Sequence, residues 1–180
     1  MNRLKLHLGC GKRFIPGFTH IDIVDYPHID HITSVDNLSM FPDNSVDLIY
    51  SCHVLEHFKR HDVVRVLKEW NRVLKKDGII RTAVPDFEKL VEVYLKYHDL
   101  KLIIGPLFGR LDYLYNIHYN IFDYQTLSKY LSASGFINIH HYDWRQTEHS
   151  NIDDFSQAYV PHMDKANGIL ISLNVEAVKG

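Results

Sequence analysis

Two glycines and one carboxylate near the N-terminus are the residues of this sequence whose types and spacing best suit a nucleotide. Gly9 and Gly11 directly follow an apolar stretch, and Asp22 stands between two isoleucines, eleven residues after Gly11. Glycines at the end of a strand let the backbone approach a ligand closely. A carboxylate at the end of the next strand can accept hydrogen bonds from ribose hydroxyls. The pattern predicts a nucleotide site, and its alternative is a tight turn.

A second group of reactive side chains follows an expected strand at residues 47–51. The run His53-Val54-Leu55-Glu56-His57 matches the H-x-x-E-H signature of inverted zincins, a class of zinc hydrolases. Zinc binding by this motif requires both histidines on one face of a helix, together with a distal carboxylate. Because the run directly follows a buried strand, a loop would break that helical register. We therefore expect no metal, and a zinc hydrolase is kept as an alternative function.

Further motifs follow in a fixed order along the chain. The five motifs are Gly9-Cys10-Gly11, the acid Asp22, Phe41-Pro42-Asp43-Asn44-Ser45-Val46-Asp47, Leu55-Glu56-His57 and Arg72-Val73-Leu74-Lys75-Lys76-Asp77-Gly78. This succession, over residues 4–85, resembles the class I S-adenosylmethionine-dependent methyltransferases. Within them, the chain is most similar to small stand-alone methyltransferases of type 11. Five motifs in this order are hard to obtain by chance.

The resemblance implies a methyltransferase whose cofactor is S-adenosyl-L-methionine. It implies that the two glycines border the methionine moiety and that Asp22 binds the ribose hydroxyls. Asp36 would take the adenine amino group, with the backbone of Asn37 or Leu38 on the ring; the alternative for Asp36 is a turn residue. The expected cofactor-binding residues are Gly9, Cys10, Gly11, Asp22, Ile23, Asp36, Asn37, Leu38, Ser51 and His53.

Histidines are the expected catalytic side chains. A hydroxyl or amine acceptor needs a base, and a histidine near its unperturbed pKa suits that role. His53, at the end of the fourth strand, is the first candidate, with His57 and His118 behind it. The alternative is that these histidines only form hydrogen bonds within the fold. The acceptor is expected to be a small molecule or a saccharide.

The elements that must position these residues alternate along the chain. Strands are expected at residues 4–8, 19–23, 31–34, 47–51, 79–85, 136–142 and 169–178. Helices are expected at 61–75, stopped by Gly78, at 87–97, capped by Asp86, and at 124–134, capped by Asp123. The expected inward residues of the first helix are Val63, Val66, Leu67, Trp70, Val73 and Leu74, and those of the second are Phe87, Leu90, Val91 and Tyr94. Alternating strands and helices indicate an α/β fold with a mostly parallel sheet. The resemblance implies a Rossmann-like seven-stranded sheet of order 3-2-1-4-5-7-6, with an antiparallel last strand and helices on both faces.

The first half of this sheet is expected to be trimmed. Only residues 12–18 separate the glycines from the second strand, and Pro16-Gly17 would break a helix there. A parallel crossover normally takes a dozen or more residues. The third glycine of nucleotide-binding loops is also missing, which argues against a dehydrogenase that seats a pyrophosphate at a helix start.

Two long connections are expected on the acceptor side, at residues 98–122 and 143–167. The first should bring His118, Tyr119, Asn120 and Phe122 back to the pocket. The second is expected to form an acceptor-binding flap, or alternatively a dimer contact, and it holds Trp144, His149, Phe155, Tyr159, His162 and Met163. A non-catalytic nucleotide-binding module is a further alternative. The many aromatic and histidine side chains of the expected flap argue against it.

Composition sets the remaining expectations. At 180 residues, 46% hydrophobic and 23% charged, the chain is expected to form a single domain, 1–180, as a monomer or homodimer. A net charge of −2 provides no basic field for nucleic acid, and no apolar run has the length of a membrane helix. The start shows no signal-peptide layout, so a cytoplasmic protein is expected. Cys10 and Cys52 should lie at the same edge of the sheet and stay reduced.

Overall fold

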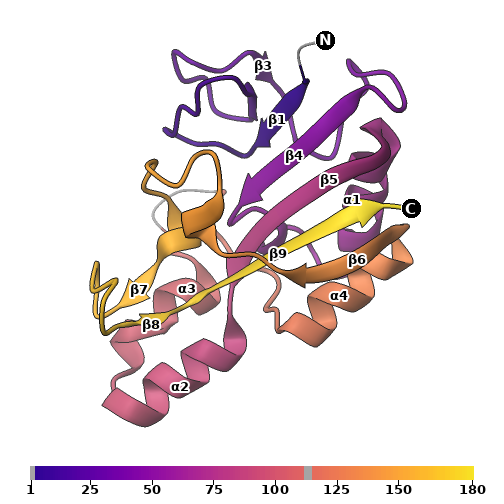
Figure 1. Ribbon diagram of the computed structural model, residues 1–180. Coiled ribbons are helices and arrows are strands. Elements are labelled where there is room, and N and C mark those ends of the chain that lie inside the picture. Colours follow the sequence, from indigo (N-terminus) through magenta and orange to yellow (C-terminus); the bar gives the residue numbers. More distant parts are fainter. Residues whose placement is uncertain (1–2, 112–114) are drawn as a thin grey trace.

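The short apolar strands pair into one seven-stranded sheet in the computed structural model, which describes residues 3–111 and 115–180. The order is β3-β2-β1-β4-β5-β9-β6, and β9 runs antiparallel to both of its neighbours (Figure 1). These strands are β1 (Lys5–Leu8), β2 (Thr19–Asp22), β3 (His31–Ile32), β4 (Val46–Cys52), β5 (Leu74–Pro85), β6 (Phe136–His141) and β9 (Ser172–Lys179). With β9 as the seventh strand of the expected order, the predicted topology is confirmed.

The predicted helices are present: α2 has the predicted bounds, α1 is shorter at both ends, and α4 ends one residue earlier. The α-helices are α1 (Val63–Val73), α2 (Phe87–Tyr97), α3 (Ile104–Phe108) and α4 (Tyr124–Ala133). The 3₁₀ helices are η1 (Leu55–His57), η2 (Leu100–Leu102), η3 (Trp144–Gln146) and η4 (Phe155–Gln157). The predicted last strand is divided at Ile171, so that β8 (Ile169–Leu170) pairs with β7 (Tyr159–Val160) in a separate two-stranded sheet.

Helix α1 ends earlier than predicted because the chain joins the sheet sooner. Leu74 is already extended and pairs with Val46 of β4. Gly78 therefore lies inside β5 and does not terminate the helix. The buried stripe of α1 is the expected one, and it consists of Val63, Val66, Leu67, Trp70 and Val73.

Helix α2 begins at the predicted cap but buries a different face. The Asp86 side chain accepts from the backbone N–H groups of Glu88 and Lys89. Of the four residues expected inward only Leu90 is buried; Phe87, Val91 and Tyr94 are exposed, and the other buried position is Val93. The reason is that α2 packs on η2, β7 and β8, through a cluster of buried residues that consists of Leu90, Val93, Ile103, Val160 and Ile171.

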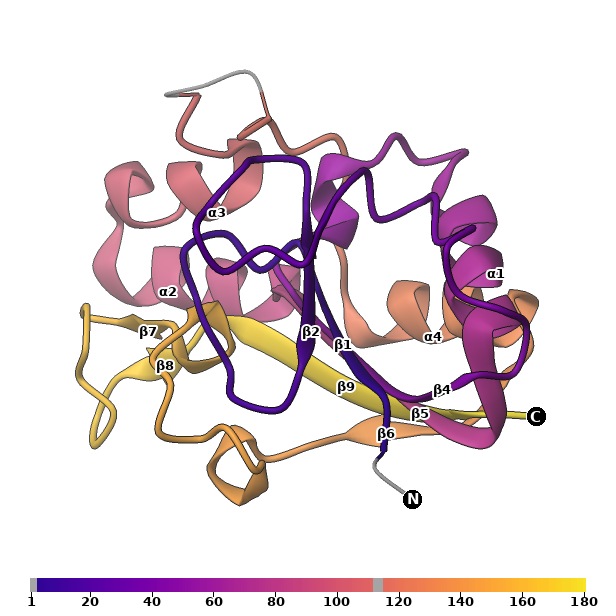
Figure 2. The same cartoon turned by 90° about the horizontal axis from the view of Figure 1, so that it is seen from above.

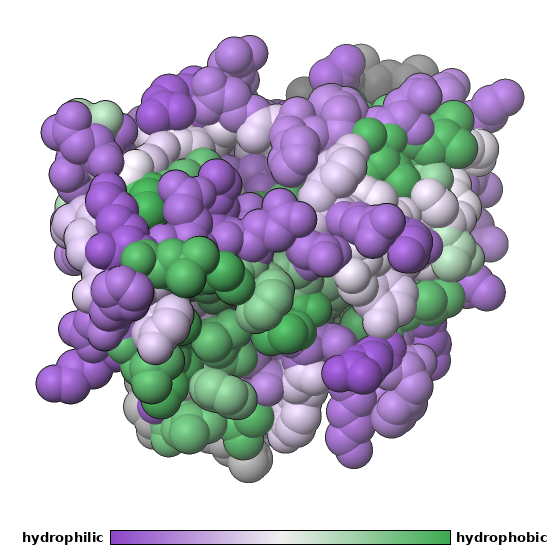
Figure 3. All heavy atoms as spheres, turned by 90° about the horizontal axis from the view of Figure 1, so that it is seen from below, coloured by the Kyte–Doolittle hydropathy of each residue, from purple (hydrophilic) through white to green (hydrophobic). Residues whose placement is uncertain are grey.

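Exposed apolar side chains remain on α2, η2 and α3. They include Leu95, Leu100, Ile104 and Phe108. Figure 3, seen from below, shows apolar side chains gathered among polar ones on this side of the molecule. Within the described residues, no helix has the length and apolar character that crossing a membrane requires.

The two faces of the sheet are covered differently. Helices α1 and α4 pack together on one face over the main core (Figure 2). On the other face, Leu48 and Tyr50 pack with Ile15, Phe18 and Ile152, which come from irregular segments. Helices were expected on both faces, but among the described residues no α-helix covers this second face. The reason is that the connections after β1 and β2 are too short to hold one. The predicted trimming of the first half is confirmed.

Strand register brings the candidate residues to one edge of the sheet. Leu8 at the end of β1 pairs with Ile21 of β2 and with Ser51 of β4. One residue further, Cys52 pairs with Ala83 of β5. The segments that follow β1, β2 and β4 therefore leave the sheet side by side. We call this edge the carboxyl edge.

Candidate active site

The glycine turn after β1 begins at a position that only glycine fits. Gly9 has a φ of 63°, a left-handed conformation that side chains disfavour, and its N–H donates to the Ile21 carbonyl at 2.8 Å. A Cβ atom at Gly9 would lie 2.5 Å from a methyl group of Val54. Gly11 is also left-handed, with a φ of 54°, but a Cβ atom there would face open space. The turn is thus packed on one side and open on the other.

Asp22 holds this turn against the end of β2. Its Oδ2 accepts from the Gly11 N–H at 2.8 Å, and its Oδ1 accepts from the Val24 N–H at 2.9 Å. The residue is 7% exposed. A carboxylate oxygen can accept more than one hydrogen bond, so each oxygen keeps capacity for a ligand hydroxyl. Ile23, the next residue, is exposed beside it.

The predicted adenine-binding residues are engaged within the protein. Asp36 accepts from the Ser34 hydroxyl and pairs with Arg65 of α1 at 2.9 Å. Burial raises the pKa of Asp36, but the hydrogen bonds from Ser34 and Arg65 outweigh it and leave this pKa below its usual value. The amide N–H groups of the next two residues, Asn37 and Leu38, donate to the Ser34 carbonyl and to Glu69. A ligand here has to compete with these bonds.

The end of β4 presents His53, while Ser51 turns inward. The Ser51 hydroxyl is fully buried against Thr82 at 2.9 Å. His53 has a φ of 55°, and its ring lies 5.2 Å from that of Phe155, measured between centroids. Its Nε2 is 3.3 Å from the Ser172 hydroxyl. Burial, and then the neighbouring His118 and His57, lower the pKa of His53 to about 3. The ring is therefore neutral at physiological pH.

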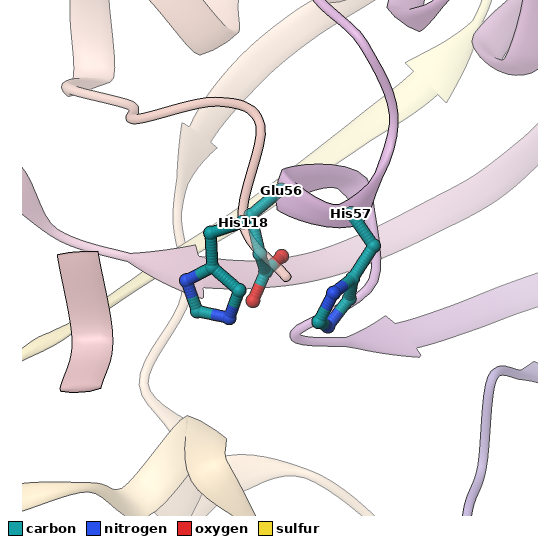
Figure 4. A group of neighbouring side chains, drawn as sticks. All are labelled: Glu56, His57 and His118. Atoms are coloured by element: carbon teal, nitrogen blue, oxygen red, sulfur yellow. The ribbon is translucent and has the colours of Figure 1, made fainter. Parts of the chain in front are cut away.

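Three side chains meet just beyond His53, and two of them are the predicted His57 and His118 (Figure 4). Glu56 is the third, and one possible ligand atom from each residue lies within 4.8 Å of the others. The Glu56 carbonyl accepts from the N–H groups of Tyr119 and Asn120. These bonds dock the 98–122 connection on η1. The predicted return of this connection to the carboxyl edge is confirmed for its described part; residues 112–114 lie outside the described residues.

Burial shifts the pKa values of all three groups. It raises the pKa of Glu56 to about 8. Burial, followed by the proximity of His57, lowers the pKa of His118 to about 4. Burial also lowers the pKa of His57, against the opposing effect of the Ile117 and His53 carbonyls. At neutral pH all three side chains therefore favour their uncharged forms.

The H-x-x-E-H zinc geometry is not formed. Within this run, the 3₁₀ helix η1 starts at Leu55, so His53 precedes it and does not share a helical turn with His57. His53 faces Ser172 and Phe155, whereas His57 faces His118, with 4.8 Å between the ring centroids. The predicted break in helical register is confirmed.

The two cysteines follow the prediction. Cys10 comes directly after the end of β1, and Cys52 ends β4, the neighbouring strand. Both thiols are free. Burial, and then the nearby Asp22, raise the pKa of Cys10 to about 12, so this thiol is unreactive at neutral pH.

Most of the expected flap covers a face of the sheet. The ring of His149 lies 4.2 Å from that of Tyr50, and the Tyr50 hydroxyl donates to Asp154 at 2.5 Å. Phe155 reaches the carboxyl edge, where it contacts His53. An acceptor-binding role for residues 143–167 stays a prediction.

Glu56 and Ser172 are the site residues that the sequence reasoning did not single out. Glu56 belongs to the H-x-x-E-H run, and its place one turn after a buried strand is a signal that could have identified it. Ser172 begins β9, and its approach to His53, 119 positions earlier in the chain, leaves no local pattern in the sequence.

Comparisons with known proteins agree with this fold. Residues 21–82 match the family model described as a methyltransferase domain. No curated protein matches the sequence. A SAM-dependent methyltransferase from Archaeoglobus fulgidus superposes with a TM-score of 0.62 at 16% identity, over 98% of this chain and 86% of that chain.

Two further solved structures share the fold. One is the 1,6-didemethyltoxoflavin-N1-methyltransferase of Burkholderia thailandensis with bound 1,6-didemethyltoxoflavin and S-adenosylhomocysteine, at a TM-score of 0.59, 14% identity, and coverage of 98% of this chain and 70% of that chain. The other, from Bordetella parapertussis and described as a possible exported protein, has a TM-score of 0.61 at 15% identity over 99% of this chain, which spans 62% of that protein's length. The chain thus carries a segment that matches the methyltransferase-domain model, and it has the fold of solved S-adenosylmethionine-dependent methyltransferases.

Proposed function

We propose that this protein transfers a methyl group from S-adenosyl-L-methionine to a small-molecule or saccharide acceptor at the carboxyl edge. The observation that carries the proposal is the register that brings Gly9, Asp22 and His53 to neighbouring strand ends. Ligands of open α/β sheets bind outside the carboxyl ends of the strands, where the strand order reverses. Here that point lies between β1 and β4.

The residues at this edge fit such a cofactor. The open side of the turn at Gly9, Cys10 and Gly11 would border the methionine moiety, and His53 would form the facing wall. Ser51, whose hydroxyl is buried against Thr82, could contribute only its backbone. Asp22 keeps acceptor capacity for the ribose hydroxyls, with Ile23 exposed beside it. Adenine would lie by residues 36–38, where the hydrogen bonds to Ser34, Glu69 and Arg65 must be shared or exchanged. This part of the site is expected to adjust most when the cofactor binds.

The chemistry requires alignment and a place for one proton. The cofactor supplies an electrophilic methyl group on a sulfonium sulfur. The protein must hold the acceptor for in-line attack and exclude water. A new bond joins the acceptor atom to the methyl carbon, the carbon–sulfur bond breaks, and the acceptor's proton leaves. We assign that proton to His53, whose ring is neutral, with His57 and His118 as the next candidates. A pKa of about 3 makes His53 a weaker base than an unperturbed histidine, so this role requires that the bound substrates raise that pKa.

The whole chain, 1–180, is assigned to one domain, with residues 98–122 and 143–167 as acceptor-side insertions. Three contacts support this assignment: Tyr119 and Asn120 on Glu56, and Phe155 on His53. A monomer or homodimer, a cytoplasmic location and the lack of a nucleic-acid partner stay predictions from the sequence.

A panel of metabolites and nucleotide sugars, assayed for release of S-adenosylhomocysteine, tests the function. Once an acceptor is found, His53→Ala should slow turnover by about 10²–10⁴-fold, as expected for a lost general base, while cofactor affinity stays nearly intact. His140→Ala, at an exposed histidine of β6, is the matched control and should leave turnover unchanged.

Two results would change the proposal. Cofactor binding without turnover on a broad acceptor panel would favour a non-catalytic binding module. A collapse of cofactor affinity in His53→Ala would place His53 in the cofactor wall, and the base would then be sought at His57 or His118.

A further inference from the structure

The cluster of Glu56, His57 and His118 is drawn from two distant parts of the chain. Glu56 and His57 lie in η1, and His118 arrives from the connection that docks there. In Figure 4 the two imidazoles flank the Glu56 carboxylate, and one possible ligand atom from each side chain lies within 4.8 Å of the others. The arrangement offers two nitrogen ligands and one oxygen ligand around a shared space.

The Glu56 carboxylate is buried without a hydrogen-bond partner among the described residues. The residue is 0% exposed, and neither Oε1 nor Oε2 accepts a hydrogen bond from residues 3–111 or 115–180. The His53 Nδ1 lies 3.3 Å from Oε1, but not in hydrogen-bonding geometry. Burying a carboxyl group without a partner costs free energy, and a bound cation removes that cost. The fold therefore keeps an acidic group at this position that the protein itself does not satisfy.

The two histidines are oriented with one nitrogen free for a ligand. The Nδ1 atoms of His57 and His118 lie 3.1 Å and 2.8 Å from the carbonyls of Ile117 and Pro106. A carbonyl only accepts hydrogen bonds, so each Nδ1 carries the proton, and each neutral ring keeps its lone pair on Nε2. Metal-binding histidines characteristically donate their other ring N–H to a backbone carbonyl in this way.

We propose that Glu56, His57 and His118 bind one divalent transition-metal ion of the zinc class. Three protein ligands of this kind leave a fourth coordination position open for water or substrate. Tetrahedral zinc, with bonds of about 2.1 Å, holds its ligand atoms about 3.4 Å apart, so the three side chains must close slightly around the ion. The partial exposure of His57 and His118 leaves a path for the ion to enter.

This ligand set differs from the one that the sequence motif suggested. The expectation of no metal rested on His53 and His57 failing to share a helical face, and the structure keeps those two side chains apart. The proposed site instead replaces His53 with Glu56 and His118. It assigns His57 and His118 to metal binding, which leaves His53 as the group that accepts a proton.

The open coordination position gives the site a use in methyl transfer, and this use rests on the proposed function. An acceptor hydroxyl bound to the ion would have a lower pKa and would be held beside His53. The metal site thus points to acceptors with an oxygen atom that can coordinate a cation, such as a sugar hydroxyl or a phenol.

Metal binding can be measured without any acceptor. Protein purified without an affinity tag and treated with a chelator should bind one equivalent of Zn²⁺ in calorimetry. Its Co²⁺ form should show the intense visible absorption of tetrahedral cobalt. Glu56→Gln and His118→Gln should each weaken Zn²⁺ binding at least tenfold. His61→Gln, at a histidine whose side chain is 79% exposed, is the matched control and should bind as the wild type does.

Circular dichroism of each variant shows whether it has folded, and His57→Gln replaces any variant that has not. Absence of stoichiometric binding by the folded wild type, or affinity that the Glu56 and His118 variants leave unchanged, would overturn the proposal. Binding of S-adenosylhomocysteine is titrated separately on the same samples. Its failure alongside intact Zn²⁺ binding would refute the proposed function and leave the metal site standing.

Discussion

Two buried carboxylates on neighbouring parts of the carboxyl edge have opposite surroundings. Asp22, on the side where we propose that the cofactor binds, receives a backbone N–H on each oxygen. Glu56, on the side where we propose that the acceptor binds, receives none from the part of the chain that the structure describes. Both are almost fully buried, at 7% and 0% exposure. Burial alone therefore does not distinguish a group that holds the fold together from one that is available to a ligand.

The difference indicates how the two sides are built. On the cofactor side, short turns replace helices, and the carboxylate of Asp22 organises them by accepting from Gly11 and Val24. On the proposed acceptor side, a long connection brings His118 beside Glu56, and the two carboxylate oxygens of Glu56 accept no hydrogen bond from the described residues. A satisfied buried group stabilises the folded state, whereas an unsatisfied one costs stability. We infer that the cofactor side is preorganised and that the acceptor side is completed by what binds there.

The largest expected effect is a difference in unfolding free energy between the alanine variants of Gly9 and Gly11. Gly9→Ala should destabilise the protein by about 2–4 kcal/mol, because the new Cβ meets Val54 at a left-handed backbone position. Gly11→Ala has the same backbone strain but open space around the Cβ, and should cost only about 1 kcal/mol. Urea unfolding of both variants measures the difference. Equal losses would show that the turn is not packed against Val54.

The next effect concerns His7 of β1, whose buried Nδ1 has no hydrogen-bond partner among the residues that the structure describes. Burial, and then His20 and His149, lower the pKa of His7 well below its usual value. The folded state therefore binds fewer protons than the unfolded state at acid pH. Stability from this group is complete above a pH of about 6.5 and falls by up to about 1.4 kcal/mol for each pH unit below it.

Replacement of His7 should reduce that acid sensitivity. We expect His7→Phe to show a smaller loss of unfolding free energy between pH 7 and pH 5 than the wild type, because the phenyl ring does not titrate. The exposed His61→Gln variant should follow the wild-type profile. An unchanged profile in His7→Phe would mean that His7 is protonated as readily in the folded state as in the unfolded one.

The smallest effect has the opposite sign and lies on the acceptor side. Glu56→Met should leave stability unchanged or raise it by about 1 kcal/mol in the presence of a chelator, because it removes an unsatisfied buried carboxyl group. The Glu56 carbonyl still accepts from Tyr119 and Asn120, so the docked connection is kept. Thermal unfolding at pH 7 provides the measurement. A loss of more than 2 kcal/mol would show that the carboxyl group already has a stabilising partner.

Local signals account for much of the fold. The caps at Asp86 and Asp123 and the buried stripe of α1 depend on residues close in sequence, and all are found as predicted. The inward face of α2 was predicted wrongly because its partners, β7 and β8, come from more than 60 residues later in the chain. Irregular segments cover the second face of the sheet in place of the α-helices of the family pattern. The reason is that the connections after β1 and β2 are shorter than in that pattern.

The candidate site divides in the same way. Gly9 and Asp22 could be predicted from spacing, since the ends of adjacent parallel strands meet at one edge. The return of His118 to the carboxyl edge was predicted, whereas its contact with His57 was not. The sequence could not predict that the Glu56 carboxylate has no hydrogen-bond donor among the described residues. Its surroundings are set by side chains that are distant in sequence.

Calorimetric titration with S-adenosylhomocysteine tests the central claim most directly, because it measures the cofactor site without an acceptor. The wild type should bind, and Asp22→Ala should weaken binding by about 1–3 kcal/mol, the scale of hydrogen bonds left unmade. Circular dichroism must show that the variant is folded. Equal binding of NAD, or no binding of S-adenosylmethionine and S-adenosylhomocysteine by the folded wild type, would contradict the account.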